Sequence, residues 1–331
     1  MKAVVLPRYG GPDALELSDM PLPIPKPDQV LVRVHAVSIN DWDWEILRGQ
    51  SLLVRMLHGL FRPKVRVIGC DFAGRIARLG ERVTTLRVGD EVYGDLCMQG
   101  FGAFAEYACA PETALARKPA SMTFEQAAAI PQAAMLAVQG LIDVGQIRPR
   151  QKVLLNGAGG GVGTFALQIA KTQYDAEVTV VDRADKLDML RALGADHVID
   201  YRQEDFTRNA QSYDLIVDTK TNRSPLAYAR ALDPNGTYVT VGGSIPRLLQ
   251  TALLGPLMSR VSGKHVRVVG LKPNKDLAYV NQLFEAGDLT PVIERQYTFS
   301  DVAEAFRLFG AADHKGKIVL TIGEDARPMT D

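Results

Sequence analysis

The sequence predicts an α/β protein in which a doubly wound parallel sheet accompanies a β-rich domain. Three observations point to this class. Short apolar strands separated by glycine turns fill residues 1–118, strands alternate with helices over residues 152–271, and a glycine cluster directly follows the first strand of the alternating region. Residues 290–331 again contain strands, so the chain begins and ends with the same kind of structure.

The β-rich domain is predicted from alternating side chains. In residues 29–38 every second residue is apolar or small, which is typical of a strand with one buried face. Prolines at positions 21, 23, 25 and 27 exclude a helix before this strand. Glycine turns bound further expected strands at residues 3–6, 72–79, 91–93 and 103–108, and helices are expected at 123–130 and 135–144.

The doubly wound sheet is predicted from residues 152–271. After the first strand, 152–155, further strands are expected at 177–181, 197–199, 214–218, 236–241 and 266–271, with helices between them. This alternation favours a parallel sheet that binds ligands at its carboxyl edge. The strands 291–297 and 317–322 and the helix 301–309 are expected to return to the first domain. The predicted domains are residues 1–120 and 121–289, with 290–331 as the return.

The glycine cluster joins strand 152–155 to a helix whose apolar residues recur at the spacing of one buried face. Residues 158–163 follow the pattern A-x-G-x-x-G, with alanine first. Unpaired N–H groups and the positive end of the helix dipole favour an anion there. We therefore expect a dinucleotide pyrophosphate at Ala158, Gly160, Gly161 and Val162, and its ribose at Asp182. The alternative is a glycine-rich turn that binds nothing.

Composition excludes several other functions. The 38 basic and 38 acidic residues balance and form no stripe or tract, so neither nucleic-acid binding nor an acidic tail is expected. The apolar stretch 248–258 is too short for a membrane span, and the run before Pro7 is too short for a signal peptide. The three cysteines form no C-x-x-C motif and cannot all pair, which favours a reducing, cytoplasmic compartment.

Several motifs in a fixed order now suggest a family. They are residues 38–43 (SINDWD), 69–74 (GCDFAG), 88–92 (VGDEV), 104–107 (FAEY), the glycine loop and 193–201 (LGADHVIDY). Over nearly its whole length the chain resembles the medium-chain dehydrogenase/reductase superfamily. Within it the chain is similar to the zinc-independent quinone oxidoreductase branch related to zeta-crystallin. The resemblance implies a Rossmann domain beside a GroES-like catalytic domain.

The resemblance also bears on metal. In zinc alcohol dehydrogenases of this superfamily two cysteines and a histidine hold the catalytic zinc, and the matching positions here are Asn40, Cys70 and Gln132. Only the cysteine is a good zinc ligand, so no zinc is expected. A site made by His35, Cys70 and Asp71 is the alternative. Without a Lewis acid, hydride transfer from NAD(P)H to an electron-poor quinone or α,β-unsaturated carbonyl is favoured over oxidation of simple alcohols.

The resemblance assigns roles to further residues. Asn40 is expected to bind a substrate oxygen or the nicotinamide ribose, with helix capping as the alternative. Asp43 is a candidate catalytic residue, with a surface or helix-start acid as the alternative. Gly242, Gly243 and Ser244 match nicotinamide contacts, unless they form a plain strand-ending turn. No histidine cluster exists, and the sequence indicates no general acid.

The choice of coenzyme depends on four residues. Asp182 alone favours NADH, because a carboxylate binds the ribose 2′-hydroxyl and repels a 2′-phosphate. Arg183 directly follows Asp182, and Lys186 and Tyr201 match positions that hold this phosphate in NADPH-using quinone reductases. Two cations and a phenol against one carboxylate attract a dianion. We therefore expect NADPH, with NADH tolerated; the alternative is that the two cations are ordinary solvated charges.

Assembly and rival functions complete the expectations. Strand 266–271 is expected at a sheet edge, where it pairs two copies into a homodimer. Residues 244–264 are expected to form a wall of the substrate pocket or a subunit contact. The rival functions are a zinc-free oxidoreductase that acts on other carbonyls or alcohols, and a low-turnover nucleotide-binding protein with a structural or regulatory role.

Overall fold

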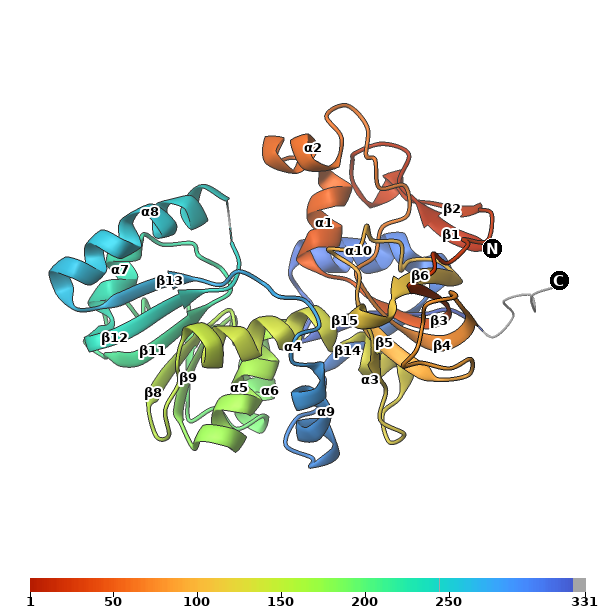
Figure 1. The fold of residues 1–331 in the computed structure, drawn as a ribbon. Helices are drawn as coiled ribbons and strands as arrows, with labels where there is room; N and C mark the ends of the chain where they lie inside the picture. Colours follow the sequence, from red (N-terminus) through yellow and green to blue (C-terminus); the bar gives the residue numbers. More distant parts are fainter. Residues whose placement is uncertain (244, 324–331) are drawn as a thin grey trace. The chain divides into compact units, whose positions relative to one another are not determined.

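The computed structural model describes residues 1–243 and 245–323. The chain forms two compact units (Figure 1). Of the described residues, the first unit contains 1–132, 273–281 and 293–323, and the second contains those within 133–272 and 282–292. The expected domain boundaries lay at residues 120/121 and 289/290. The first unit also includes helix α3 (Phe124–Ala128) and the start of α4 (Pro131–Val138).

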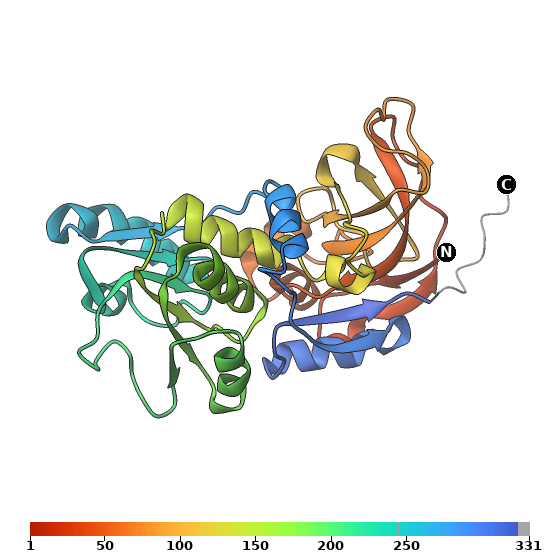
Figure 2. The ribbon, with the colours of Figure 1, turned by 90° about the horizontal axis from the view of Figure 1, so that it is seen from below.

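The first unit is built on a mixed sheet of seven strands, in the order β14-β15-β3-β4-β5-β7, with β6 also paired to β3. The strands are β3 (Gln29–Ser38), β4 (Asp71–Leu79), β5 (Glu91–Asp95), β6 (Tyr107–Pro111), β7 (Ala116–Arg117), β14 (Ile293–Thr298) and β15 (Lys317–Thr321). A separate antiparallel pair is formed by β1 (Lys2–Val5) and β2 (Glu16–Asp19). Figure 2 shows the blue C-terminal strands beside the orange strands, where β15 pairs antiparallel with β3.

Helices and short 3-10 turns complete the first unit, and one of its predicted strands is wrong. The helices are α1 (Asp41–Arg48), α2 (Leu52–His58), α3 and α10 (Val302–Ala311), with short 3-10 turns at Pro12–Ala14, Glu112–Ala114 and Phe299–Asp301. The strand expected at residues 103–108 is wrong, because β6 begins only at Tyr107. The N–H of Phe104 bonds the carbonyl of Ile68 and its carbonyl accepts from Val4, so this extended segment belongs to no regular ladder. The sequence also missed β2 and β7.

The second unit is a doubly wound sheet of six parallel strands, as the sequence predicts. Their order is β10-β9-β8-β11-β12-β13. The strands are β8 (Lys152–Asn156), β9 (Glu177–Asp182), β10 (His197–Asp200), β11 (Tyr213–Asp218), β12 (Leu232–Thr240) and β13 (His265–Val268). The strand order reverses between β8 and β11. Sheets of this kind bind ligands at the carboxyl ends of the strands next to such a reversal.

Helices cover both faces of this sheet (Figure 1). Helices α5 (Gly161–Tyr174) and α6 (Ala184–Ala192) pack on β8, β9 and β10, whereas α7 (Pro225–Arg230) and α8 (Ile245–Ser262) pack on β12 and β13. Helix α4 continues into a π-helical turn at Gln139–Val144, and α9 (Leu277–Glu285) follows β13. None of the described helices combines the length and apolar character that a membrane crossing requires.

Candidate functional site

The glycine turn of the second unit requires glycine at two positions. Gly157 follows β8 with φ +77°, and a Cβ there would lie 2.2 Å from the Thr219 hydroxyl oxygen. A Cβ on Gly163, in the first turn of α5, would lie 2.4 Å from Cα of Ala158. The close approach of helix and turn explains the glycine spacing. The first N–H groups of α5, from Gly161 onward, have no carbonyl partner within the helix and are available to an anion.

Asp182 holds this turn together. The backbone N–H of Gly159 donates to Asp182 Oδ2 at 2.7 Å, and the N–H of Arg183 donates to Oδ1 at 2.8 Å. The side chain is only 6% exposed. The sequence predicts that Asp182 contacts a ribose, whereas in the structure both of its oxygens already accept backbone hydrogen bonds. Its charge is therefore partly used to fix the turn.

Three cations lie around Asp182. Burial lowers the pKa of Lys186, and the charges of Lys220 and Arg183 lower it further, whereas the Asp182 charge raises it. Arg183 forms two bonds with Asp185, Nε to Oδ1 at 3.0 Å and Nη2 to Oδ2 at 2.8 Å. Arg183, Lys186 and Lys220 thus gather near the N-terminus of helix α5. This arrangement fits an additional phosphate on a dinucleotide.

Lys220 is a residue that the sequence interpretation missed. A Cβ on Gly157 would lie 2.8 Å from Lys220 Cγ, so the lysine stem lies over the glycine turn. Lys220 follows the fourth strand of the sheet rather than the second. The available signal was its position at the carboxyl end of a neighbouring parallel strand. Tyr201, which the sequence did indicate, is 44% exposed, with the Arg202 guanidinium 5.9 Å from the centre of its ring.

Asp218 organises the same sheet edge. Its side chain is fully buried and accepts hydrogen bonds from Asn156 Nδ2 at 2.8 Å, the Tyr238 hydroxyl at 2.8 Å and the N–H of Lys220 at 2.9 Å. The sequence interpretation did not single out this residue. Its bonds join the carboxyl ends of β8, β11 and β12, so that the glycine turn and Lys220 are attached to one rigid edge.

The turn after β12 also depends on side chains of the β11 end. Gly243 has φ +120°, and a Cβ there would lie 2.5 Å from Cβ of Thr221. The carbonyl of Gly242 accepts hydrogen bonds from the hydroxyls of Thr221 and Thr240. Ser244, the third predicted nicotinamide contact, lies outside the described residues. The two glycines are thus held at the carboxyl edge of the sheet, where nicotinamide contacts were predicted.

The first unit contains a buried polar cluster around Asn40, here called the Asn40 cluster. All of its six members are 5% exposed or less, and they come from five separate segments of the chain: Asn40 and Asp43, Asp71, Asp95, Gln132 and Lys317. Three of these residues are carboxylic acids and one is a cation. Burial of so many ionisable groups is costly unless they bond one another.

Lys317 is the central cation of the Asn40 cluster. Its ammonium nitrogen donates to Asn40 Oδ1 at 2.6 Å and to the carbonyl of Ile39 at 3.0 Å, and it lies 3.8 Å from Asp71 Oδ2. Burial lowers the pKa of Lys317, and Asp71 opposes this shift. Asn40 Nδ2 lies near Asp71 but makes no hydrogen bond of acceptable geometry within the described residues. The Asn40 amide is therefore fixed through its oxygen, and its N–H donors remain.

The carboxyls of Asp71 and Asp95 bind neighbouring N–H groups. The Gln132 N–H donates to Asp71 Oδ2 at 3.1 Å, and the Cys97 N–H donates to Asp95 Oδ1 at 2.6 Å. Burial raises the pKa of Asp71 well above its usual range, the Asp95 charge raises it further and the Lys317 charge lowers it. Burial also raises the pKa of Asp95. One ammonium among three buried acids favours protonation of part of this cluster.

Asp43 is not a surface residue. It is fully buried in the first turn of α1, and it accepts from the N–H of Asn40 at 3.0 Å and from the N–H of Gly69 at 3.1 Å. Burial raises the pKa of this carboxyl to about 7, against the opposing effect of the Asn40 hydrogen bond. The surface alternative is wrong because both oxygens are needed to join α1 to the loop before β4. The helix-start interpretation is correct, and Asn40 is the N-cap residue of α1.

The residues at the three expected zinc-ligand positions do not fit a zinc ion. Asn40 Oδ1 already accepts from an ammonium, and Gln132 Nε2 donates to Asp95 at 3.4 Å. Cys70 is fully buried and is the one residue of the three whose type is a good zinc ligand. The described residues contain no group of three His, Cys, Asp or Glu side chains able to hold a metal. His35 of the alternative set stacks on Phe124, with ring centres 4.3 Å apart.

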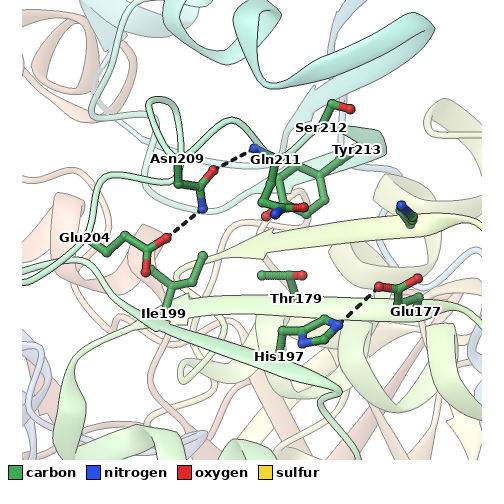
Figure 3. A pocket seen from close by; sticks show the side chains of 10 residues that line it. Glu177, Thr179, His197, Ile199, Glu204, Asn209, Gln211, Ser212 and Tyr213 are labelled. Atoms are coloured by element: carbon green, nitrogen blue, oxygen red, sulfur yellow. Dashed lines mark hydrogen bonds and ion pairs between the residues drawn. The ribbon is translucent and has the colours of Figure 1, made fainter.

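A separate pocket of about 230 Å³ lies in the second unit (Figure 3). Its lining comes from the amino ends of β8 to β11, and includes Lys152, Glu177, His197 and Tyr213. His197 Nε2 lies 3.1 Å from Glu177 Oε1, and Asn209 Nδ2 donates to Glu204 at 2.7 Å. The glycine turn lies at the opposite, carboxyl edge of the same strands. This pocket is therefore distinct from the predicted nucleotide site.

Comparisons with known proteins add independent findings. The family model of the alcohol dehydrogenase GroES-like domain matches the sequence over residues 26–120. The family model described as zinc-binding dehydrogenase matches residues 193–320. An NADPH-dependent alkenal/one oxidoreductase of Arabidopsis thaliana is 33% identical, over 97% of this chain and 79% of that protein. A 2-methylene-furan-3-one reductase of Solanum lycopersicum is 31% identical, over 97% and 79% of the two chains. The quinone oxidoreductase structure from Coxiella burnetii superposes with a TM-score of 0.87 at 27% identity, over 98% and 99% of the two chains.

Proposed function

Because this chain belongs to the medium-chain dehydrogenase/reductase superfamily, in its quinone oxidoreductase branch, we propose that it is an NADPH-dependent reductase of quinones or α,β-unsaturated carbonyls. The observation that carries the proposal is the Lys317 ammonium bound to Asn40. It lies among the positions where zinc-dependent relatives hold their metal, and it leaves an amide donor rather than a Lewis acid. An electron-poor acceptor needs no stronger polarisation.

Coenzyme binding is assigned to the second unit. The α5 N-terminus and the turn at Ala158, Gly160, Gly161 and Val162 bind the pyrophosphate. Arg183, Lys186 and Lys220 attract the 2′-phosphate, and exposed Tyr201 adds a hydroxyl. Gly242 and Gly243 contact the nicotinamide. When bound, the reduced nicotinamide supplies the hydride. Asp182 fixes the turn, and NADH is tolerated because the pyrophosphate contacts are common to both coenzymes.

Asn40 is the proposed substrate or nicotinamide-ribose ligand. Because the Asn40 side-chain oxygen accepts from Lys317, the groups left to bind a ligand are the two N–H donors of its amide. Such donors suit a ligand oxygen on which negative charge develops. Lys317 and Asp43 are positioning residues in this proposal. The first binds the side-chain oxygen of Asn40, and the second binds its backbone N–H. The source of the proton that completes the reduction is not assigned to a side chain.

The test is the oxidation of NADPH by the purified chain. We expect turnover with a panel of small quinones, 2-alkenals and enones, and none with simple ketones. Activity should survive dialysis against a chelator, and elemental analysis should give far less than one zinc per chain. Turnover of ketones or alcohols alone, or activity restored only by added zinc, contradicts the proposal. NADPH binding without turnover over the whole panel indicates the low-turnover alternative.

We also propose a homodimer and a cytoplasmic location. Strand β13 forms an edge of the six-stranded sheet, and the adjacent helix α8 exposes an apolar stripe at every fourth residue: Leu249, Leu253, Leu257 and Val261. A sheet edge beside such a stripe favours pairing with a second copy. Sedimentation should give a mass near twice 36.1 kDa. The three cysteines are unpaired, which favours a reducing compartment.

A further inference from the structure

Helix α2 exposes the side chains that a surface helix normally buries. Of its seven residues only Val54 is buried. Large apolar side chains are exposed along the helix and the turn after it, in a set here called the α2 patch: Leu52, Leu53, Met56, Leu57, Leu60 and Phe61. Phe61 is 86% exposed. Single exposed apolar residues are ordinary, but six within ten residues mark an interaction surface.

The backbone beneath the α2 patch is firmly attached to the first unit. The Tyr9 hydroxyl donates to the carbonyl of Gly59 at 2.6 Å, and Arg55 Nε donates to the carbonyl of Gly49 at 2.6 Å. The Arg55 guanidinium also lies 5.0 Å from the centre of the Tyr9 ring. A Cβ on Gly59 would lie 2.0 Å from the carbonyl oxygen of Arg62, so the turn after α2 is tight. The apolar side chains are therefore presented by an ordered segment.

The segment that carries the α2 patch contains charged side chains of positive sign only. Residues 46–70 contain five cations and no Asp or Glu, in a chain whose formal net charge is zero. The cations are Arg48, Arg55, Arg62, Lys64 and Arg66. Arg62, Lys64 and Arg66 are exposed, and no carboxylate pairs with them in the part of the chain that the structure describes. The segment thus combines outward apolar side chains with unneutralised positive charge.

We propose that the α2 patch docks this protein on the surface of an anionic membrane. Leucine, methionine and phenylalanine side chains enter the boundary between headgroups and acyl chains, while Arg and Lys bind the anionic headgroups. A second copy of the chain is a poor occupant, because a symmetric contact would bring the three exposed cations Arg62, Lys64 and Arg66 against the same three. The inference is independent of the proposed substrate class. An attachment of this kind needs no membrane-spanning helix.

The experiment is cosedimentation of the full chain with lipid vesicles. We expect binding to vesicles of phosphatidylcholine and phosphatidylglycerol in equal parts, and at least about tenfold weaker binding to phosphatidylcholine alone. Phe61→Ser should weaken binding about tenfold. The triple change Arg62→Gln, Lys64→Gln and Arg66→Gln should weaken it about one hundredfold, and high salt should have a similar effect.

Matched controls test whether position matters. Ile24→Ser removes an apolar side chain that is 83% exposed elsewhere in the first unit, and Arg78→Gln with Arg82→Gln and Arg87→Gln removes three exposed cations outside the patch. Both controls should bind mixed vesicles like the unchanged protein, and thermal melting confirms that every variant folds. Equal binding to both kinds of vesicle, or equal losses in patch and control variants, overturns the proposal.

Two further outcomes also overturn the proposal. If Phe61→Ser halves the sedimenting mass without vesicles, the patch is a contact between copies. If it changes only KM for a water-soluble substrate and leaves vesicle binding intact, the patch is a wall of the substrate site. Failure of the chain to bind any vesicle while it captures an acidic peptide assigns the patch to a protein partner.

Discussion

The glycine turn of the second unit and the Asn40 cluster of the first unit are held together in different ways. The turn presents backbone N–H groups from one short stretch of chain, held by a single carboxylate at Asp182. The Asn40 cluster gathers side chains from five separate segments and buries them almost completely. The turn is therefore specified by local geometry, whereas the cluster is specified by hydrogen bonds and an ion pair between residues that are far apart in the sequence. Removing one side chain should therefore lower the free energy of unfolding more in the Asn40 cluster than in the glycine turn.

The largest expected effect comes from removing the cation of the Asn40 cluster. Lys317→Met leaves the buried Asp71 without its ammonium, and should lower the free energy of unfolding by about 3–5 kcal/mol. It also frees Asn40 Oδ1, so kcat should fall more than KM rises. Urea denaturation and steady-state kinetics measure the two effects. The half-buried neighbour Lys315→Met is the control, and equal losses in both variants contradict the assigned role.

The pH dependence of stability should sharpen the same comparison. Burial raises the pKa of Asp43 to about 7, so the folded protein keeps a proton that the unfolded chain loses above its ordinary value near 4. More protons bound in the folded state mean that stability falls as pH rises through this window and then levels off. The loss attributable to Asp43 is at most about 4 kcal/mol.

The measurement is the slope of the unfolding free energy between pH 4 and pH 7. Asp43→Asn cannot titrate and should give a flatter slope, even if its stability is lower at every pH. Asp185→Asn is the matched control in the second unit, because its carboxyl has a lowered pKa that results mainly from the Arg183 hydrogen bonds. An unchanged slope in the Asp43 variant would mean that this carboxyl is ionised throughout.

A smaller effect is expected from the glycine turn. Gly163→Ala places a Cβ 2.4 Å from Cα of Ala158, and should destabilise the second unit by about 1–3 kcal/mol. Gly160→Ala is the control, because the nearest atom to its Cβ is 4.0 Å away, and its stability should be unchanged. Urea denaturation of the two variants measures the difference in their free energies of unfolding. Equal stability of both proteins would show that helix and turn can separate without cost.

The smallest expected effect concerns coenzyme choice. Lys220→Ala removes one of three cations and should lower the ratio of kcat/KM for NADPH over that for NADH about tenfold, or about 1.4 kcal/mol. Lys152→Ala, at the opposite edge of the same sheet, should leave this ratio unchanged. An unchanged ratio in the Lys220 variant would restrict phosphate recognition to Arg183, Lys186 and Tyr201.

These two regions also differ in how far the sequence predicted them. The turn could be predicted because glycine spacing and strand-helix alternation are local patterns, and the same alternation predicted a doubly wound parallel sheet. Lys220 and Asp218 were missed because they enter the same edge from another strand. The buried position of Asp43 and the role of Lys317 could not be predicted, since both depend on partners that are far apart in the sequence. A lysine beginning an apolar strand, as in residues 317–320, was the only available signal.

The hydrogen bond between Gly159 and Asp182 has a consequence for how coenzyme is captured. It holds the turn in a fixed shape in the free protein, so little conformational entropy remains to be lost at this loop when a dinucleotide arrives. The turn should therefore keep its shape when the dinucleotide binds. The association rate is then governed by diffusion and by the positive electrostatic field of the neighbouring cations. Selectivity between coenzymes then appears in how long each one stays.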